Sequence, residues 1–158
     1  GFVAAIVAGA LAPFLQGAGL LSPVAPLKGP VFAVLGTVAA VMGIVATLWA
    51  QESMGDSWRI GVDAGETTQL VDRGMFGWVR NPIFTAMLVF GAGVALMAPN
   101  PLALIGFVLL LTSIELQVRF VEEPYLQRTH SERYRDYASR VGRFVPRIGR
   151  SPIGGPSA

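Results

Sequence analysis

The chain has 158 residues, of which 53% are hydrophobic and 14% are charged, and its mean hydropathy is +0.56. Because soluble domains carry about 25% charged residues, this composition favours a single integral membrane domain. The sequence contains no cysteine, which excludes disulfides, thiolate metal sites and cysteine nucleophiles. The single histidine, His130, excludes a metal site built from several histidines, and we expect no metal.

Two long apolar runs open the sequence. Residues 2–21 and 31–50 are uncharged and about 20 residues long, which is enough to cross the hydrocarbon core of a bilayer as helices. Prolines and a glycine in residues 22–30 break the apolar pattern between them. We therefore expect residues 1–50 to form a scaffold helix hairpin.

The second run carries small residues at helical spacing. Gly36, Ala40 and Gly43 share one helical face. Small residues let two helix backbones approach closely in a membrane. This stripe therefore predicts tight packing of the second helix against a neighbour.

Two shorter apolar runs, residues 84–98 and 102–114, follow a polar connector at residues 51–82. The Pro99-Asn100-Pro101 segment between them indicates a sharp turn. Each run alone is short for a membrane span, but beside two long runs we expect a tight transmembrane hairpin. The predicted fold class is all-α, a polytopic transmembrane helix bundle of about four spans with a C-terminal amphipathic cytoplasmic segment.

The basic residues determine the expected orientation. Lys28 lies in the first hairpin turn, whereas the other basic residues lie between the two hairpins or from Arg119 onward. Because positive residues are retained in the cytoplasm, both polar regions and the C-terminus are expected there. Trp49 lies just before the connector, and Trp58 and Trp78 lie within it; indole rings favour the membrane interface. The arginine-rich, lysine-poor composition favours a bacterial source and therefore the bacterial inner membrane.

The segment Arg80-Asn81-Pro82 is the first candidate site. Proline suits the first helical turn and asparagine is a good N-cap, so a plain helix start with an interfacial arginine is one interpretation. In the other, Arg80 and the free N–H groups of the helix start hold an anionic group such as a carboxylate. Gly91 and Gly93 in the following run either serve helix packing or admit a ligand against the backbone.

A charged cluster ends the last apolar run. On a regular helical wheel Glu115, Arg119 and Glu122 share one face. One interpretation is a functional site, because ionisable side chains at membrane depth are often functional. The other is an ion pair whose side chains reach the membrane interface. The arginine-rich residues 125–148 follow. They are expected either to lie on anionic membrane lipids or to fold back over a site. Interleaved acidic residues argue against nucleic-acid binding.

Several short motifs follow one another in a fixed order between residues 73 and 146. They are Gly74, Arg80-Asn81-Pro82-Ile83-Phe84, Arg119-Phe120-Val121-Glu122-Glu123-Pro124-Tyr125-Leu126, Tyr134, Tyr137 and Arg143-Phe144-Val145-Pro146. Together they resemble the isoprenylcysteine carboxyl methyltransferase-like and phospholipid methyltransferase-like family of integral membrane enzymes. The segment Met54-Gly55-Asp56-Ser57-Trp58-Arg59 also resembles bacterial relatives. The chain departs from the commonest pattern at Asn81, where histidine is frequent, and at Phe84, where tyrosine is frequent.

The resemblance implies methyl transfer from S-adenosyl-L-methionine to a lipophilic acceptor that enters from the bilayer. The residues that it implies for the cofactor pocket are Arg80, Asn81, Pro82, Gly91, Gly93, Glu122 and Glu123. Phe84, Tyr134 and Tyr137 are further cofactor-binding candidates, because aromatic rings can bracket adenine or contact a cationic methyl donor. The predicted catalytic residues are Glu122 and Arg119, of which Arg119 would orient an acidic acceptor.

The implied organisation is one membrane domain over residues 1–158. Its expected parts are the scaffold hairpin at 1–50, the connector at 51–82, a hairpin with the cofactor-binding segment at 83–150, and a disordered tail at 151–158. Because the chain opens with Gly1 rather than methionine, we expect further residues before it. Two other interpretations remain: an NADPH-dependent membrane reductase of the steroid-reductase type, which the same plan resembles, and a non-enzymatic membrane scaffold.

Overall fold

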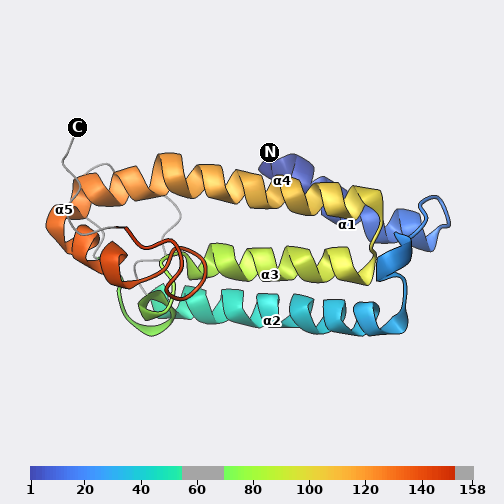
Figure 1. Cartoon of the computed structure of the whole chain (residues 1–158), viewed down its shortest axis with the longest axis horizontal. Helices are drawn as coiled ribbons and strands as arrows, with labels where there is room; N and C mark the ends of the chain where they lie inside the picture. The colour runs from blue at the N-terminus through green and yellow to red at the C-terminus, as the bar shows by residue number, and fades with distance from the viewer. Residues whose placement is uncertain (55–69, 152–158) are drawn as a thin grey trace. The chain divides into compact units, whose positions relative to one another are not determined.

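The computed structural model describes residues 1–54 and 70–151, and every named element in them is helical (Figure 1). The all-α class is thereby confirmed for this part of the chain. The segment after Met54 that includes Trp58, and residues 152–158 of the predicted tail at 151–158, lie outside the described residues. In chain order the elements are α1 (Phe2–Gly17), η1 (Ala25–Leu27), α2 (Pro30–Met54), η3 (Gly74–Gly77), α3 (Pro82–Met97), α4 (Pro101–Gln117), η4 (Val118–Glu122) and α5 (Glu123–Arg140).

Proline opens three of these helices. Pro30, Pro82 and Pro101 are the first residues of α2, α3 and α4. The fixed φ of proline suits a first helical turn, and its missing N–H would have had no intrahelical partner there. Asn100 adds a side-chain cap to α4, because its Oδ1 accepts a 3.0 Å hydrogen bond from the backbone N–H of Ala103.

The helices divide between two compact units, of which the first comprises Gly1–Val45 and Ala86–Val118. Within it α1 packs along α4. The buried amide of Asn100 donates to the carbonyl oxygen of Ala12 at 3.0 Å and to Oε1 of Gln16 at 3.1 Å. These bonds satisfy a polar side chain that would otherwise be costly to bury, and they tie the end of α1 to the start of α4.

Helix α2 packs closely against α3 in this unit (Figure 1). A Cβ added at Gly36 would lie 2.6 Å from the carbonyl oxygen of Gly93, and one added at Gly43 would lie 2.6 Å from the backbone nitrogen of Phe90. Neither position has room for a side chain. The small-residue stripe of the second apolar run therefore makes the tight helix contact that its spacing predicts.

Two helical stretches in the described residues are long and apolar enough to cross a membrane, namely α2 and Pro101–Arg140, which comprises α4, η4 and α5. The apolar helices α1 and α3 are shorter, so the count of about four spans stays a prediction. Many large apolar side chains of α2 are exposed, which fits a surface that contacts lipid rather than water. They include Val31, Val34, Leu35, Val38, Val41, Met42, Ile44, Val45, Leu48 and Trp49.

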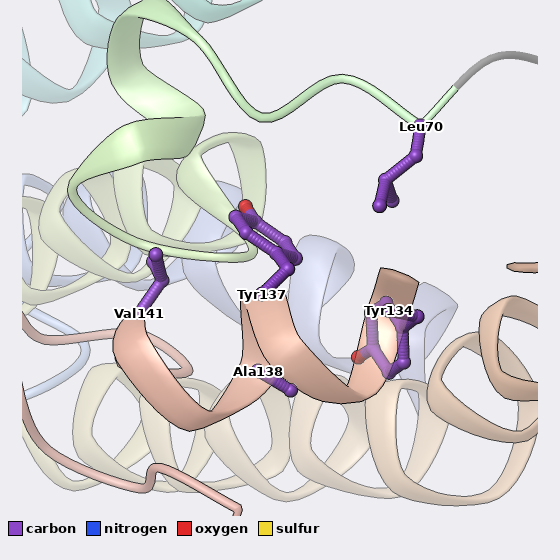
Figure 2. Packing of buried hydrophobic residues seen from close by; sticks show 5 residues of the cluster. All are labelled: Leu70, Tyr134, Tyr137, Ala138 and Val141. Carbon is purple, nitrogen blue, oxygen red and sulfur yellow. The ribbon is translucent and has the colours of Figure 1, made fainter. Parts of the chain in front are cut away.

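The second unit comprises Ala46–Thr85 and Arg119–Ala158. Figure 2 shows its buried cluster, in which Leu70 points toward α5 and the tyrosines belong to that helix. Helix α5 is interrupted at Ser131, whose φ of 40° lies in a region that serine rarely adopts. The interruption divides α5 just before the residues that form this core. The cluster consists of Leu70, Tyr134, Tyr137, Ala138 and Val141.

Element η4 is a π-helical turn that joins α4 to α5. A π turn has more residues than an α-helical turn, so the rotation per residue changes across it. The regular wheel that placed Glu115, Arg119 and Glu122 on one face assumed an unbroken α-helix, whereas α4 ends at Gln117, so their shared face stays a prediction. Residue spacing alone could not show this turn, because its signature is a backbone hydrogen-bond pattern.

Candidate functional site

The start of α3 is bound by the segment that follows α5, and both belong to the second unit. The backbone N–H of Arg80 donates to the carbonyl oxygen of Gly142 at 2.8 Å. The carbonyl oxygen of Arg143 accepts two bonds from Asn81, at 3.2 Å from the backbone nitrogen and 3.2 Å from Nδ2. We call Gly142–Gly149 the C-terminal clasp. The clasp thus binds the backbone N–H groups of the two residues directly before α3.

A buried ion cluster lies where the clasp meets the beginning of α5. Nη1 of Arg80 is 3.0 Å from Oε1 of Glu123. The same carboxylate accepts two hydrogen bonds from Arg143, 2.8 Å from Nε and 2.9 Å from Nη2. The side chains of Arg80, Glu123 and Arg143 are 2%, 12% and 18% exposed. Two guanidinium groups therefore share one carboxylate where solvent screens their attraction only weakly.

Arg80 is the most deeply buried member of the cluster. Its Nη1 donates to the hydroxyl of Tyr134 at 3.1 Å, and its Nη2 donates to the carbonyl oxygen of Gly149 at 2.7 Å. Its Nε is buried and has no hydrogen-bond partner among the residues that the structure describes. An unpaired donor in a cluster with two cations and one anion suits a negatively charged acceptor such as a carboxylate.

Two buried tyrosines support this arrangement from the charged part of α5, beyond the apolar stretch of the helix. Tyr134 and Tyr137 are 1% and 4% exposed, and their ring centroids are 6.2 Å apart. Burial raises the pKa of both hydroxyls, although Arg80 opposes this rise at Tyr134. The hydroxyl of Tyr137 therefore stays protonated and donates to the carbonyl oxygen of Phe76 at 2.6 Å. Both rings are covered by protein, so their direct contact with a cofactor stays a prediction.

The other candidates of the second unit lie on either side of the cluster in the chain. Pro82 is buried and Phe84 is half-buried in the first turn of α3. Arg119 is exposed and Glu122 is half-buried on η4, directly before Glu123. Because π turns are frequent at functional sites, the placement of this turn beside the cluster agrees with a site here.

The glycine pair belongs to the other unit. A Cβ added at Gly93 would lie 2.6 Å from the carbonyl oxygen of Gly36, and one added at Gly91 would lie 2.7 Å from Cδ2 of Leu110. Both glycines thus allow close contact between parts of the protein itself. A role for them in lining a cofactor site stays a prediction.

Sequence reasoning did not assign a role to Arg143 or to Gly149. Arg143 is one of many arginines after α4, and only the Arg-Phe-x-Pro motif distinguished it from the others. Gly149 contributes a backbone carbonyl, which no residue pattern reports. The contacts of folded segments, rather than residue type, reveal both.

Comparison with known proteins gives a family match for this chain. The model of the family described as phospholipid methyltransferase matches residues 31–133. This range includes Arg80 and Glu123, whereas Tyr134, Tyr137 and Arg143 lie beyond it.

Two curated relatives carry isoprenylcysteine methyltransferase names. The protein-S-isoprenylcysteine O-methyltransferase of Saccharomyces cerevisiae is 33% identical over 79 residues, which are 50% of this chain and 33% of the yeast protein. Protein-S-isoprenylcysteine O-methyltransferase B of Arabidopsis thaliana is 30% identical over 81 residues, which are 51% of this chain and 41% of the plant protein. The chain thus matches less than half the length of either relative.

A solved structure shares the fold. It is the eukaryotic intramembrane Ras methyltransferase ICMT (isoprenylcysteine carboxyl methyltransferase), determined without a monobody. The TM-score is 0.71 at 22% sequence identity, and the match covers 92% of this chain and 52% of that protein. The chain therefore shares the helical fold of that protein.

Proposed function

The chain belongs to the phospholipid methyltransferase family, and from this premise we propose that it transfers a methyl group from S-adenosylmethionine to a lipophilic acceptor. The observation that carries the proposal is the buried cluster of Arg80, Glu123 and Arg143. Arg80 and Glu123 lie inside the residues that match the family, and the fold brings them together in one unit. The names of the relatives support methyl transfer as the reaction class.

The residues of the cluster fit the chemistry of S-adenosylmethionine. This molecule carries a carboxylate, ribose hydroxyls and a positively charged sulfonium. The unpaired Nε of Arg80 and the excess of positive charge suit the carboxylate. The carboxylate of Glu123 suits the ribose hydroxyls or the sulfonium charge. When bound, the cofactor supplies an electrophilic methyl group.

The chain's part in such a reaction is positioning rather than acid–base chemistry. Methyl transfer to a nucleophile is an in-line displacement, so alignment of the reacting groups and exclusion of water lower its barrier. The low exposure of Glu123 and Arg80 meets the second requirement. We assign the cofactor-facing role to Glu123, whose carboxylate is bound by Arg80. Asn81, Pro82 and Phe84 would line the site at the start of α3.

The acceptor is proposed to enter laterally from the bilayer. The exposed apolar faces of the helices fit contact with lipid, and the exposed Arg119 lies on the turn that leads to Glu123. Arg119 would orient an acidic acceptor. Glu122 lies between Arg119 and Glu123 in the sequence and is the second proposed catalytic residue. From the distribution of positive charge, this site would face the cytoplasm.

Ligand-dependent stability of the detergent-solubilised protein tests the proposal. At 100 times its dissociation constant, a ligand that binds only the folded state stabilises it by about 2.7 kcal/mol. We expect S-adenosylhomocysteine to raise the melting temperature of the wild-type protein and to raise it much less in Glu123→Ala. NADPH is the parallel ligand, and we expect no shift with it.

Each outcome has a distinct meaning. A shift with S-adenosylhomocysteine that Glu123→Ala abolishes supports the methyltransferase assignment. Incubation of the protein with methyl-labelled S-adenosylmethionine and total membrane lipid would then show which lipid fraction acquires the label. A shift with NADPH alone would replace the proposal by a reductase, and no shift with either ligand would overturn an adenosyl-cofactor function.

A further inference from the structure

Arg143 holds the Glu123 carboxylate more completely than Arg80 does. Arg143 contacts both carboxylate oxygens through two nitrogens, at 2.8 and 2.9 Å. Arg80 reaches one of these oxygens, and its other terminal nitrogen is bound to the carbonyl of Gly149. Two parallel N–H···O bonds determine the plane of a carboxylate, whereas a single contact leaves it free to rotate. The orientation of Glu123 therefore depends on Arg143.

The backbone of Arg143 is itself held at both of its polar groups. Its carbonyl oxygen accepts from Asn81, and its N–H donates to the carbonyl oxygen of Ile148 at 2.9 Å. The neighbouring carbonyl of Phe144 accepts a 3.0 Å hydrogen bond from Oγ1 of Thr85. The clasp thus attaches to the first turn of α3 at successive residues. It presents the Arg143 guanidinium from an anchored backbone rather than from a free tail.

The turn within the clasp needs unusual backbone geometry. A Cβ added at Gly142 would lie 2.7 Å from the carbonyl oxygen of Ile148 and 2.8 Å from the backbone nitrogen of Arg147. Arg147 and Gly149 have positive φ values of 67° and 73°. For arginine this conformation is uncommon, and it persists where surrounding contacts require it. The fold therefore maintains the clasp in one compact shape around the Arg143 backbone.

We propose that Arg143 is a positioning residue that orients the Glu123 carboxylate for the cofactor, which makes the C-terminal clasp part of the binding site. This inference rests on the proposed function for the identity of the ligand. The contact of Arg143 with Glu123, however, exists without a ligand. Lysine cannot replace Arg143 here, because an ammonium group offers a point charge and not a planar pair of donors.

The test compares Arg143→Lys with Arg150→Lys, which makes the same chemical change at an exposed position just beyond the clasp. Affinity for S-adenosylhomocysteine is measured by calorimetry at a temperature where every variant is folded. We expect Arg143→Lys to raise the dissociation constant about tenfold, the loss that one charge-assisted hydrogen bond implies. Arg150→Lys should stay within about twofold of the wild type. Wild-type affinity in Arg143→Lys would overturn the proposal.

A second measurement separates positioning of Glu123 from a general structural role. Melting temperatures without ligand are determined for the wild type, Arg143→Lys, Glu123→Gln and the double variant. If Arg143 acts through Glu123, Arg143→Lys lowers the melting temperature of the wild type but barely that of Glu123→Gln. Equal losses in both backgrounds would overturn the proposal. If the wild-type protein binds no S-adenosylhomocysteine, the proposed function fails, and this cycle still decides whether Arg143 holds Glu123.

Discussion

The buried guanidinium of Arg80 donates a 3.1 Å hydrogen bond to the hydroxyl of Tyr134, 54 residues further along the chain. The centre of the guanidinium also lies 6.0 Å from the centroid of the Tyr134 ring. One residue of this pair precedes the first turn of α3 and the other belongs to α5. The pair therefore connects two distant segments of the second unit, and each partner limits the freedom of the other.

Tyr134→Phe should lower the free energy of unfolding by about 1–2 kcal/mol, because it leaves a buried charged donor without one of its acceptors. Thermal unfolding in detergent measures the change. Tyr125→Phe is the matched control, since Tyr125 is exposed on the same helix and should tolerate the loss of its hydroxyl. Equal melting temperatures for both variants would contradict a supporting role for the Tyr134 hydroxyl.

Arg80→Ala should destabilise the protein by about 3 kcal/mol, the usual cost of removing one partner from a buried ion pair. It removes a charge from beside Glu123 and leaves the Tyr134 hydroxyl and the Gly149 carbonyl without their donor. Chemical unfolding of this variant is compared with that of Arg73→Ala, an exposed arginine of the same unit. If Arg80→Ala unfolds at the wild-type denaturant concentration, Arg80 is not part of a buried network.

Gly142→Ala should disrupt the clasp, because a new methyl group would meet backbone atoms that cannot move independently. Overpacking of this kind costs about 1–3 kcal/mol. Gly77→Ala provides the comparison, since its Cβ would meet its nearest atom, the carbonyl oxygen of Asp72, at an ordinary 3.5 Å. Limited proteolysis after Arg147 or Arg150 should be faster in Gly142→Ala than in Gly77→Ala. Similar cleavage rates in the two variants would argue against a closed clasp.

Gly93→Ala should show whether Gly93 serves helix packing or contact with a ligand. An added methyl group would lie 2.6 Å from the carbonyl oxygen of Gly36, so we expect a loss of about 1–3 kcal/mol without any ligand. Gly9→Ala on α1 has open space around the new atom and should be neutral or stabilising by up to about 1 kcal/mol. Unchanged stability in Gly93→Ala together with lost cofactor affinity would instead favour the ligand role.

Individual helices and the turns between them could be predicted from the sequence. The apolar run at residues 31–50 corresponds to α2, and Pro99-Asn100-Pro101 lies at the turn between α3 and α4. Both follow from local chemistry, because long apolar runs predict helices and proline marks where they start. The π turn at Val118–Glu122 did not follow, since no residue type reports a widened turn.

By itself the sequence determined an all-helical chain with long apolar runs, and it identified Arg80 and Glu123 as candidates through residue type and motif. It did not determine which of the many later arginines meets Glu123, nor that Tyr134 and Tyr137 would be buried. The tertiary structure selected Arg143, because the clasp binds the start of α3 and brings one guanidinium within 2.8 Å of the carboxylate. Ion pairing depends on distance in space, and residues far apart in a chain acquire that distance only when the segments carrying them pack together.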